Sequence, residues 1–302
     1  MTIKPFSIPI SVVGPGSHQE EVTAHTIGVP DSVETFHMPS VPEVSDRKAA
    51  LDCRQFFIDL YNAMLSWNIN SGEPGPALAV NGYSPATLAL INQMLGEGEV
   101  AIRIQIPNKH FDEIRVQESV FVGIWRVRYF HKNVAIADQL EVSALPSCVA
   151  EAAYTLTQPQ LNKVNVTPEA MNSPAILAEI KQSLSKWDPG SAPITINLSH
   201  LPMTPADAKI IDEAVGNGAI HMVSRGLGNC HILSTNVRHI WKIQYFNNAP
   251  MSRMILNTIS ICGIPEEAIA SSEDLQDSIE RIKELIEWIT KSWDLPPTSH
   301  LF

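Results

Sequence analysis

A cysteine beside two glycines is the residue of this 302-residue chain whose surroundings best suit chemistry. Cys230 ends the segment 224–230, Ser-Arg-Gly-Leu-Gly-Asn-Cys, in which the glycines allow a sharp turn or a close approach of the backbone to another group. A thiol placed there could be a metal ligand, a nucleophile or a transient carrier. The alternative is a buried structural cysteine on a strand. The accompanying candidates are Arg225, Gly226, Gly228 and Asn229.

The other cysteines and the histidines do not complete a catalytic or metal-binding motif. Cysteines at positions 53, 148, 230 and 262 have the spacing of neither a disulfide framework nor a zinc ribbon, so we expect reduced thiols. His231 adjoins Cys230, but consecutive strand residues face opposite sides of a sheet, which disfavours a shared metal ion. His221 could return to the same area. No serine lies in a nucleophile-elbow motif. We therefore predict no metal, no cofactor and no enzymatic activity.

A second group of candidates lies on strands predicted in the first half of the chain. Residues 100–106 alternate apolar and polar side chains, and residues 124–130 place Trp125, Val127 and Tyr129 on one face. If these strands are neighbours, their polar sides form a basic face on an acidic protein. Such a face is either an ordinary solvated sheet surface or a docking surface for an acidic or extended protein segment. The residues concerned are Arg103, Gln105, Arg115, Gln117, Glu118, Arg126 and Arg128.

Composition excludes some classes of partner. The 21 lysines and arginines are outnumbered by 32 aspartates and glutamates, and the net charge of −11 argues against a nucleic-acid partner. No apolar run approaches the roughly 18 residues that a membrane span needs. The first 13 residues carry a single lysine and polar breaks, which is not typical of a signal peptide. We predict a cytoplasmic globular protein without membrane insertion.

The sequence pattern of the elements that must position these residues occurs twice in the chain, with an offset of about 120 residues. Features common to both halves are expected to serve the fold, such as glycines that end helices with positive φ and aromatic residues that pack in the core. Features of one half are better candidates for function: the loop before Cys230 has no counterpart in the first half, where Ile114 takes the aligned position. The matching segments are 84–86 with 204–206, 96–100 with 216–220, 124–130 with 240–246, and Trp67 with Trp187.

The pattern predicts an α+β protein of two tandem pseudo-symmetric units, each helix–strand–helix–antiparallel strands–helix. The first helix is expected from Asp46 to Trp67 and the last from Glu273 to Trp293. The predicted divisions are an extended N-terminal arm at 1–44, unit one at 45–157, a polar linker at 158–172 and unit two at 173–302.

Eight short segments, in order over almost the whole chain, form a specific combination. They are Gly14 to Ser17, Phe36 to Pro39, Leu95 to Val100, Gln117 to Val127, Ser224 to Cys230, Tyr245 to Asn247, Ile255 to Thr258 and Glu273 to Ser278. On these residues the chain resembles the HupH/HyaF family of nickel–iron hydrogenase expression and maturation proteins. One departure is Leu227, where the family usually has tyrosine before its glycine–asparagine–cysteine sequence.

The resemblance implies an accessory protein for assembly of an uptake hydrogenase, with residues 173–302 as the HupH-type C-terminal region. It implies a chaperone that binds a hydrogenase subunit precursor, the iron–sulfur small subunit in the first place, together with a thioredoxin-like companion maturation protein. The family offers no established catalytic residues to carry over. The alternative function is a scaffold or carrier for a metal cofactor intermediate, which would depend on Cys230.

Overall fold

The computed structural model describes residue 44 and residues 46–68, 74–106, 110–226, 229–247 and 253–297, all within one unit of the fold, residues 41–302. The predicted N-terminal arm lies outside this part of the chain except for residue 44. The segments 14–17 and 36–39, and Gly228, also lie outside it.

The helices and strands of the first half follow the predicted order. Its elements are α1 (Arg47–Ser66), β1 (Ala77–Ala79), α2 (Pro85–Leu95), β2 (Val100–Gln105), β3 (Glu113–Glu118), β4 (Ile124–His131), β5 (Val134–Val142) and α3 (Ser147–Thr155). Those of the second half are α4 (Ser173–Lys186), β6 (Ile194–Asn197), η2 (Leu198–His200), α5 (Pro205–Val215), β7 (Ile220–Ser224), β8 (Asn229–Ser234), β9 (Ile240–Phe246), β10 (Met254–Ile261), η3 (Glu266–Ala268) and α6 (Ser272–Ser292).

Side-chain caps and glycines set the helix ends. The Ser84 hydroxyl accepts a hydrogen bond from a backbone N–H in the first turn of α2, and Thr204 forms a reciprocal capping box with Asp207 at the start of α5. Gly96 and Gly216 end these two helices with φ of 54° and 65°, a conformation that favours glycine. The predicted role of these glycines as helix C-caps is therefore confirmed.

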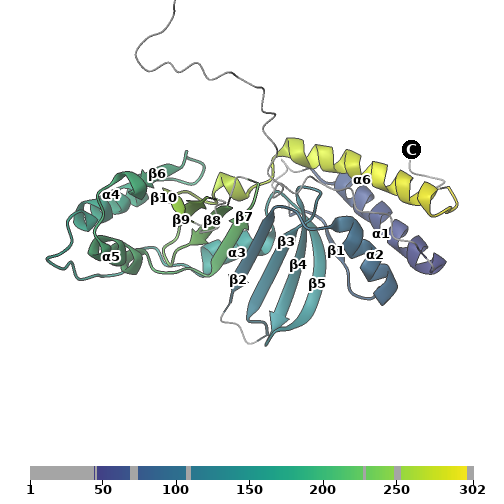
Figure 1. Ribbon diagram of the computed structural model, residues 1–302, viewed down its shortest axis with the longest axis horizontal. Coiled ribbons are helices and arrows are strands. Elements are labelled where there is room, and N and C mark those ends of the chain that lie inside the picture. Colours follow the sequence, from purple (N-terminus) through teal and green to yellow (C-terminus); the bar gives the residue numbers. More distant parts are fainter. Residues whose placement is uncertain are drawn as a thin grey trace, which may run out of the picture. The chain divides into compact units, whose positions relative to one another are not determined.

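Ten strands form one antiparallel sheet in the order β1-β5-β4-β3-β2-β7-β8-β9-β10-β6 (Figure 1). The two halves of the chain meet at its centre, where β2 pairs with β7 from Val100 opposite Ser224 to Ile104 opposite Ile220. The predicted α+β class and the antiparallel pairing are confirmed. Because the sheet is continuous, side chains from both halves share each of its faces.

One face of the central strands is buried against α3 and η3. Trp125 and Trp241 lie in this core beside Cys148 and Val149 of α3. Their indole N–H groups donate to the backbone oxygens of Ser143, at 2.8 Å, and Gly263, at 2.9 Å. A buried tryptophan needs such a partner for its N–H, so these two residues are core residues, as the sequence predicted.

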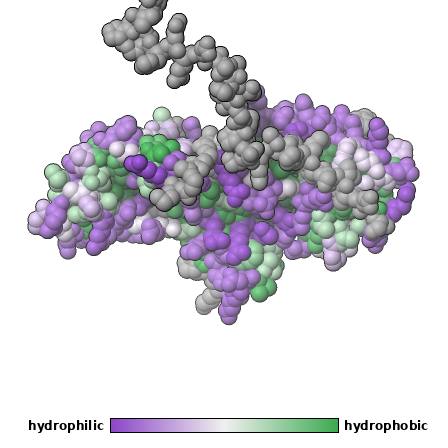
Figure 2. Space-filling model, viewed as in Figure 1, coloured by the Kyte–Doolittle hydropathy of each residue, from purple (hydrophilic) through white to green (hydrophobic). Residues whose placement is uncertain are grey.

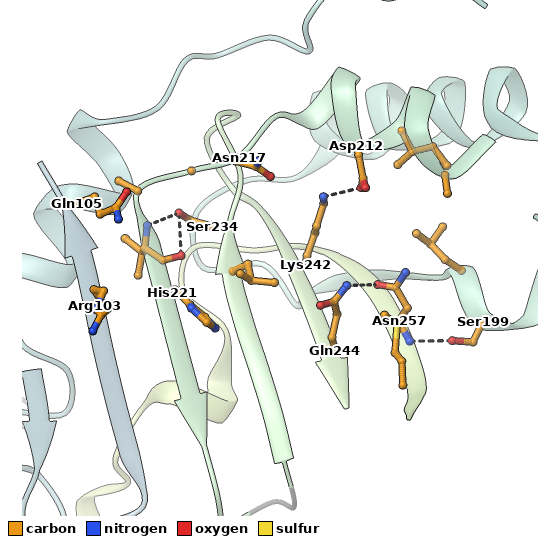
Figure 3. A pocket seen from close by; sticks show the side chains of 18 of the residues that line it. Arg103, Gln105, Ser199, Asp212, Asn217, His221, Ser234, Lys242, Gln244 and Asn257 are labelled. Atoms are coloured by element: carbon orange, nitrogen blue, oxygen red, sulfur yellow. Dashed lines mark hydrogen bonds and ion pairs between the residues drawn. The ribbon is translucent and has the colours of Figure 1, made fainter. Parts of the chain in front are cut away.

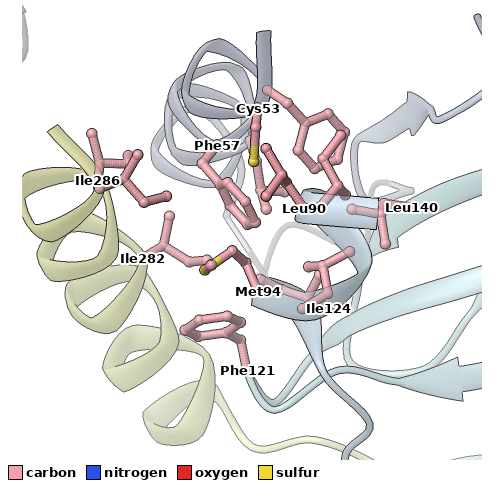
Figure 4. Packing of buried hydrophobic residues seen from close by; sticks show 14 of the residues in the cluster. Cys53, Phe57, Leu90, Met94, Phe121, Ile124, Leu140, Ile282 and Ile286 are labelled. Atoms are coloured by element: carbon pink, nitrogen blue, oxygen red, sulfur yellow. The ribbon is translucent and has the colours of Figure 1, made fainter. Parts of the chain in front are cut away.

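Within the described ranges, helices cover the opposite face only towards its two ends. Helices α1, α2 and α6 pack over Ile124 and Leu140 on one side, and their side chains converge in Figure 4. Helices α4 and α5 pack over Ile240 and Ile259 on the other side. Between these two helical layers the sheet is open, because Arg103, Gln105 and His221 in its middle are exposed.

The halves of the chain interlock through the segments that follow their last strands. Helix α6, from the second half, buries Ile282 and Ile286 in the core of α1 and α2. The segment after α3 runs to the second half, where Gln158 forms a parallel bridge with Val237. Residues 158–172, predicted as a linker, are hydrogen-bonded there; for example, the Asn162 amide donates to the Glu213 carbonyl at 2.9 Å.

Candidate functional site

A row of aligned side chains crosses the open face from β4 to β9, and in every strand of this series except β8 the aligned residue is basic. Arg128 of β4 stands opposite Arg115 of β3, and Arg115 stands opposite Arg103 of β2. The row continues through His221 of β7 and Leu233 of β8 to Lys242 of β9. Neighbouring strands are about 4.8 Å apart, which sets the spacing of the backbone positions along the row. We call Arg128, Arg115, Arg103, His221 and Lys242 the basic row.

Carboxylates neutralise the basic row incompletely. Glu113 bonds two arginines at once: Arg103 Nε lies 2.8 Å from one oxygen and Arg115 Nη2 lies 2.5 Å from the other. Lys242 Nζ lies 2.6 Å from Asp212 of α5. Like charges directly opposite one another in a sheet are destabilising. Because two arginines share one carboxylate, their pair keeps a net positive charge.

Phe130 holds the arginine end of the row in place. The Arg115 guanidinium carbon lies 4.1 Å from the centre of the Phe130 ring, and that of Arg128 lies 6.0 Å from it. These are cation–π distances, and the buried ring gives both guanidinium groups a fixed support. The buried Nε of Arg128 has no hydrogen-bond partner in the described part of the chain. The arginines at this end of the row are therefore held in position by the ring.

Two histidines form the middle of the open face. His221 Nε2 and His231 Nδ1 are 3.1 Å apart, and the His231 ring packs edge-on against Phe246. Burial lowers the pKa of His221, and the neighbouring His231 and Arg103 lower it further. His221 is therefore largely neutral at neutral pH, and the permanent charge of the row comes from its arginines and Lys242. Among the described residues, no group of three or more His, Cys, Asp or Glu side chains could hold a metal ion.

Two hollows border the row and share Arg103 in their lining. A cavity of about 760 Å³ extends from Arg103 and His221 to Lys242 and the wall of α5 (Figure 3). A second hollow, of about 880 Å³, extends from Arg103 towards Arg115 and Lys132. Both are lined by Arg103, and the second also reaches Asp112 and Leu156 beyond the ends of the strands. Figure 2 shows hydrophilic residues predominating on the side in view, with hydrophobic residues in small patches.

Of the sequence candidates, Arg103 and Arg128 belong to the basic row, whereas Arg126 anchors a helix. Arg126 forms two hydrogen bonds with Asp138, at 2.9 and 2.6 Å, and a third with Asn92 of α2. Its side chain is 18% exposed, against 60% for Arg103. Arg126 thus fixes α2 on the sheet, and a partner has little access to it.

Gln117 and Glu118 support the turn before β2. The Gln117 amide donates to the backbone oxygens of Gly98 and Val100. Glu118 is buried, and its carboxylate accepts hydrogen bonds from the backbone N–H groups of Gly123 and Val100. Burial raises the pKa of Glu118 to about 7, and the nearby Glu99 and Asp274 carboxylates add to this effect. Both side chains serve local structure in this arrangement.

Cys230 lies on the face opposite the basic row. It is 0% exposed and packs in the core beneath α3. It stands opposite Tyr245, as Ile114 stands opposite Tyr129, so the alignment of Cys230 with Ile114 agrees with the sheet register. Burial raises the pKa of the Cys230 thiol, which keeps it protonated and unreactive. The predicted placement of Cys230 and His231 on opposite faces is confirmed, and all four cysteines are free and buried.

Arg225, Gly226 and Asn229 lie at one end of the sheet, apart from both the thiol's core and the basic row. The backbone N–H of Arg225 donates to the Glu99 carbonyl at 3.1 Å. A Cβ atom on Gly226 would overlap the Glu99 carboxylate, so this glycine allows a close approach of that side chain. Asn229 begins β8 and stands opposite Phe246.

Sequence reasoning missed the contribution of the second half to the open face. Alternation along 220–224 and 240–246 could have placed His221, Lys242 and Gln244 on a polar face. No local signal shows that β7 pairs with β2, which is what brings His221 beside Arg103. Gln244 donates to Asn257 at 3.3 Å, and the Asn257 N–H donates to Ser199 at 2.7 Å, which ties the wall of the cavity beside Lys242 to η2.

Comparison with known proteins gives a consistent set of relatives. A family model described as "HupH hydrogenase expression protein, C-terminal conserved region" matches residues 63–162 and 170–289. The hydrogenase expression/formation protein HoxQ of Cupriavidus necator is 35% identical over 94% of this chain and 98% of its own length. HupH of Rhodobacter capsulatus is 33% identical over the same shares. The hydrogenase-1 operon protein HyaF of Escherichia coli is 32% identical over 67% of this chain and 69% of its own length.

A solved structure also aligns with part of the chain. It is the hydrogenase expression protein HupH from Thiobacillus denitrificans, with 21% identity and a TM-score of 0.33. The alignment covers 39% of this chain and 94% of that one. Separately, none of the helices in the described ranges combines the length and the apolar character that crossing a membrane requires.

Proposed function

We propose that this chain, which belongs to the HupH family of hydrogenase expression proteins, is an accessory protein for the formation of a nickel–iron hydrogenase. Relatives named hydrogenase expression/formation proteins match it over nearly their whole length, so the shared role is carried by the same set of elements. The protein acts by binding a hydrogenase subunit precursor and not by catalysis.

The observation that carries a binding role is the open basic face. It combines fixed arginines, two neighbouring hollows and exposed polar side chains on one sheet face, which are the properties of a surface that recognises a protein segment. The alternative role, a carrier of a metal cofactor intermediate through Cys230, gains no support, because that thiol is inside the core.

We further propose, on the resemblance to the family, that the precursor is that of the iron–sulfur small subunit. The same resemblance supports a thioredoxin-like maturation protein as a companion and the cytoplasm as the site of action. A chaperone of this kind holds the precursor stoichiometrically, and it releases the precursor without chemical change.

The two halves are proposed to be tandem pseudo-symmetric units, residues 45–157 and 173–302, joined by 158–172. Three observations support this. The strands follow in the same order outward from β2 and from β7. The family model matches one segment in each half. Tyr129 and Tyr245 stand opposite aligned residues.

Co-purification tests the proposed function. The tagged protein is isolated from hydrogenase-producing cells, bound proteins are identified by mass spectrometry, and metals are measured in the complex. We expect a stoichiometric small-subunit precursor and no stoichiometric metal on the accessory protein itself. Recovery of the protein without any hydrogenase precursor, from cells that accumulate one, would contradict the proposal.

A further inference from the structure

We propose that the basic row binds an acidic α-helical segment of the precursor, with carboxylates repeated about once per helical turn. This inference rests on the proposed function and adds the chemistry of the recognised segment. It assigns the open sheet face, and not the glycine loop or Cys230, as the place where the partner docks.

The spacing of the row favours a helix over an extended chain. Neighbouring strands are about 4.8 Å apart, so Arg128, Arg115 and Arg103 start from backbone positions at steps of that size. A helix presents same-face residues about every 5.4 Å along its axis, at i, i+4 and i+7. Alternate residues of an extended strand are about 6.7 Å apart. Three carboxylates one turn apart therefore meet three successive arginines with little adjustment.

The guanidinium groups of the row are held in position before an anionic partner binds. Phe130 supports the guanidinium groups of Arg115 and Arg128 without competing with an anion for their hydrogen bonds. A partner therefore binds side chains that are already held in place, which reduces the entropy lost on binding. The free donors of these arginines suit carboxylates, which accept paired hydrogen bonds from guanidinium groups.

The open face has the length for such a segment. From Arg128 to Lys242 the row spans five strand intervals, about 24 Å. A helix of about 16 residues has this length. At one end Arg128 stands opposite Asp138 of β5, and at the other end Lys242 bonds Asp212 of α5. The two hollows share Arg103, and between them they are lined by Arg115, Arg103, His221 and Lys242 of the row.

The charge of the whole chain limits the class of partner. A long polyanion would extend beyond the row and meet the acidic remainder of a protein with a net charge of −11. A short acidic helix meets the row alone. A peptide segment is therefore a better match than a nucleic acid.

Synthetic peptides test the chemistry directly. Three fluorescein-labelled, alanine-rich peptides of about 16 residues are compared by fluorescence anisotropy with the full-length protein. The first has three glutamates at i, i+4 and i+7, the second has them at i, i+2 and i+4, and the third has glutamines in place of the glutamates of the first. We expect the first peptide to bind several-fold more tightly than the second, and its binding to weaken as salt is raised from about 0.1 M to about 0.5 M.

Variants of the row locate the binding. Arg103→Gln and Arg115→Gln should each weaken binding of the first peptide by roughly tenfold. The matched control is Lys181→Gln combined with Lys291→Gln, which removes two exposed positive charges from α4 and α6 and should leave binding unchanged. Circular dichroism melts establish that each variant is folded. The Arg103 side chain is 60% exposed, so its substitution should disturb the fold less, and Arg103→Gln carries the test if Arg115→Gln is unstable.

The outcomes separate this inference from the proposed function. Equal binding of all three peptides, or tighter binding of the second, would overturn the inference that the row binds an acidic helix. So would a single-stranded oligonucleotide that competes for the row better than the first peptide does. The same variants are then mixed with the purified small-subunit precursor. If the precursor binds the wild-type protein and Arg103→Gln equally, only the basic-row inference fails. If the precursor does not bind the wild-type protein at all, the proposed function fails with it.

Discussion

Arg103 and Arg115 stand directly opposite one another on β2 and β3, and both donate to the single carboxylate of Glu113. Because Glu113 competes with any acidic partner for these guanidinium groups, its removal should strengthen the site. It should also bring the two arginines into mutual repulsion. The same residue therefore limits affinity and stabilises the free protein.

We expect Glu113→Gln to tighten binding of the glutamate-containing peptide by a few-fold, because the competing negative charge is gone. The thermal midpoint of unfolding should fall slightly. Anisotropy and circular dichroism melts measure the two effects on one sample. Glu280→Gln, at an exposed position on α6, is the control for a lost carboxylate. Weaker peptide binding in Glu113→Gln would mean that Glu113 is needed to aim the arginines.

Cys230 should behave as a structural residue. Its side chain is fully buried opposite Tyr245, so Cys230→Ala should lower the free energy of unfolding by about 1–3 kcal/mol through lost packing. Because burial raises the pKa of this thiol, iodoacetamide should label it only after unfolding. Urea titration and mass spectrometry of the alkylated protein measure both. Normal abundance of the alanine variant with loss of hydrogenase maturation, in air or without it, would instead show a functional thiol.

Local sequence patterns predicted the helices and strands but not which strands pair with one another. Ser84 and Thr204 mark helix starts that the structure reproduces, because a cap is a short-range interaction. The position of Arg103 beside His221 depends on the pairing of β2 with β7, and this register is a long-range property. The sequence analysis likewise placed Arg126 with Arg103 on one basic face, because the sequence does not show that Arg126 donates hydrogen bonds to Asn92 and Asp138. Charge reversal to test docking therefore belongs at Arg103 and not at Arg126.

Gly98 and Gly218, in the turns before β2 and β7, should tolerate substitution by alanine less well than Gly226, in the loop before β8. A Cβ atom on Gly98 would overlap the backbone of Ser119, and one on Gly218 would overlap Ser234. These neighbours move only with the strand, so Gly98→Ala and Gly218→Ala should each cost about 1–3 kcal/mol of stability. Gly226→Ala would meet the flexible end of Glu99 and should cost less than about 1 kcal/mol. Urea unfolding of the three variants gives the comparison, and equal losses would show that the loop is as constrained as the turns.

Glu118 should give the protein a stability that declines with rising pH. Burial raises its pKa from an ordinary 4.5 to about 7, so the folded state keeps a proton that the unfolded chain releases. The free energy of unfolding should therefore fall as pH rises between these values and level off above them, by on the order of 3 kcal/mol at most. Glu118→Gln should remove much of this slope, whereas Glu284→Gln on the surface of α6 should retain it. Urea titrations from about pH 5 to about pH 8 measure it, and an unchanged slope in Glu118→Gln would assign the effect to another group.

Helix α6 should stabilise the first half of the chain, although it belongs to the second. Ile282 is fully buried among residues of α1 and α2, so Ile282→Ala should lower the free energy of unfolding by about 2–5 kcal/mol. The loss should appear locally as faster hydrogen exchange in α1 and α2, because these helices lose their packing partner, while α4 and α5 keep their protection. Ile180→Ala on α4 is the matched control, since Ile180 is equally buried in the other end cluster and should loosen α4 and α5 instead. Faster exchange in α4 and α5 of the Ile282 variant would show that the second half depends on its own last helix.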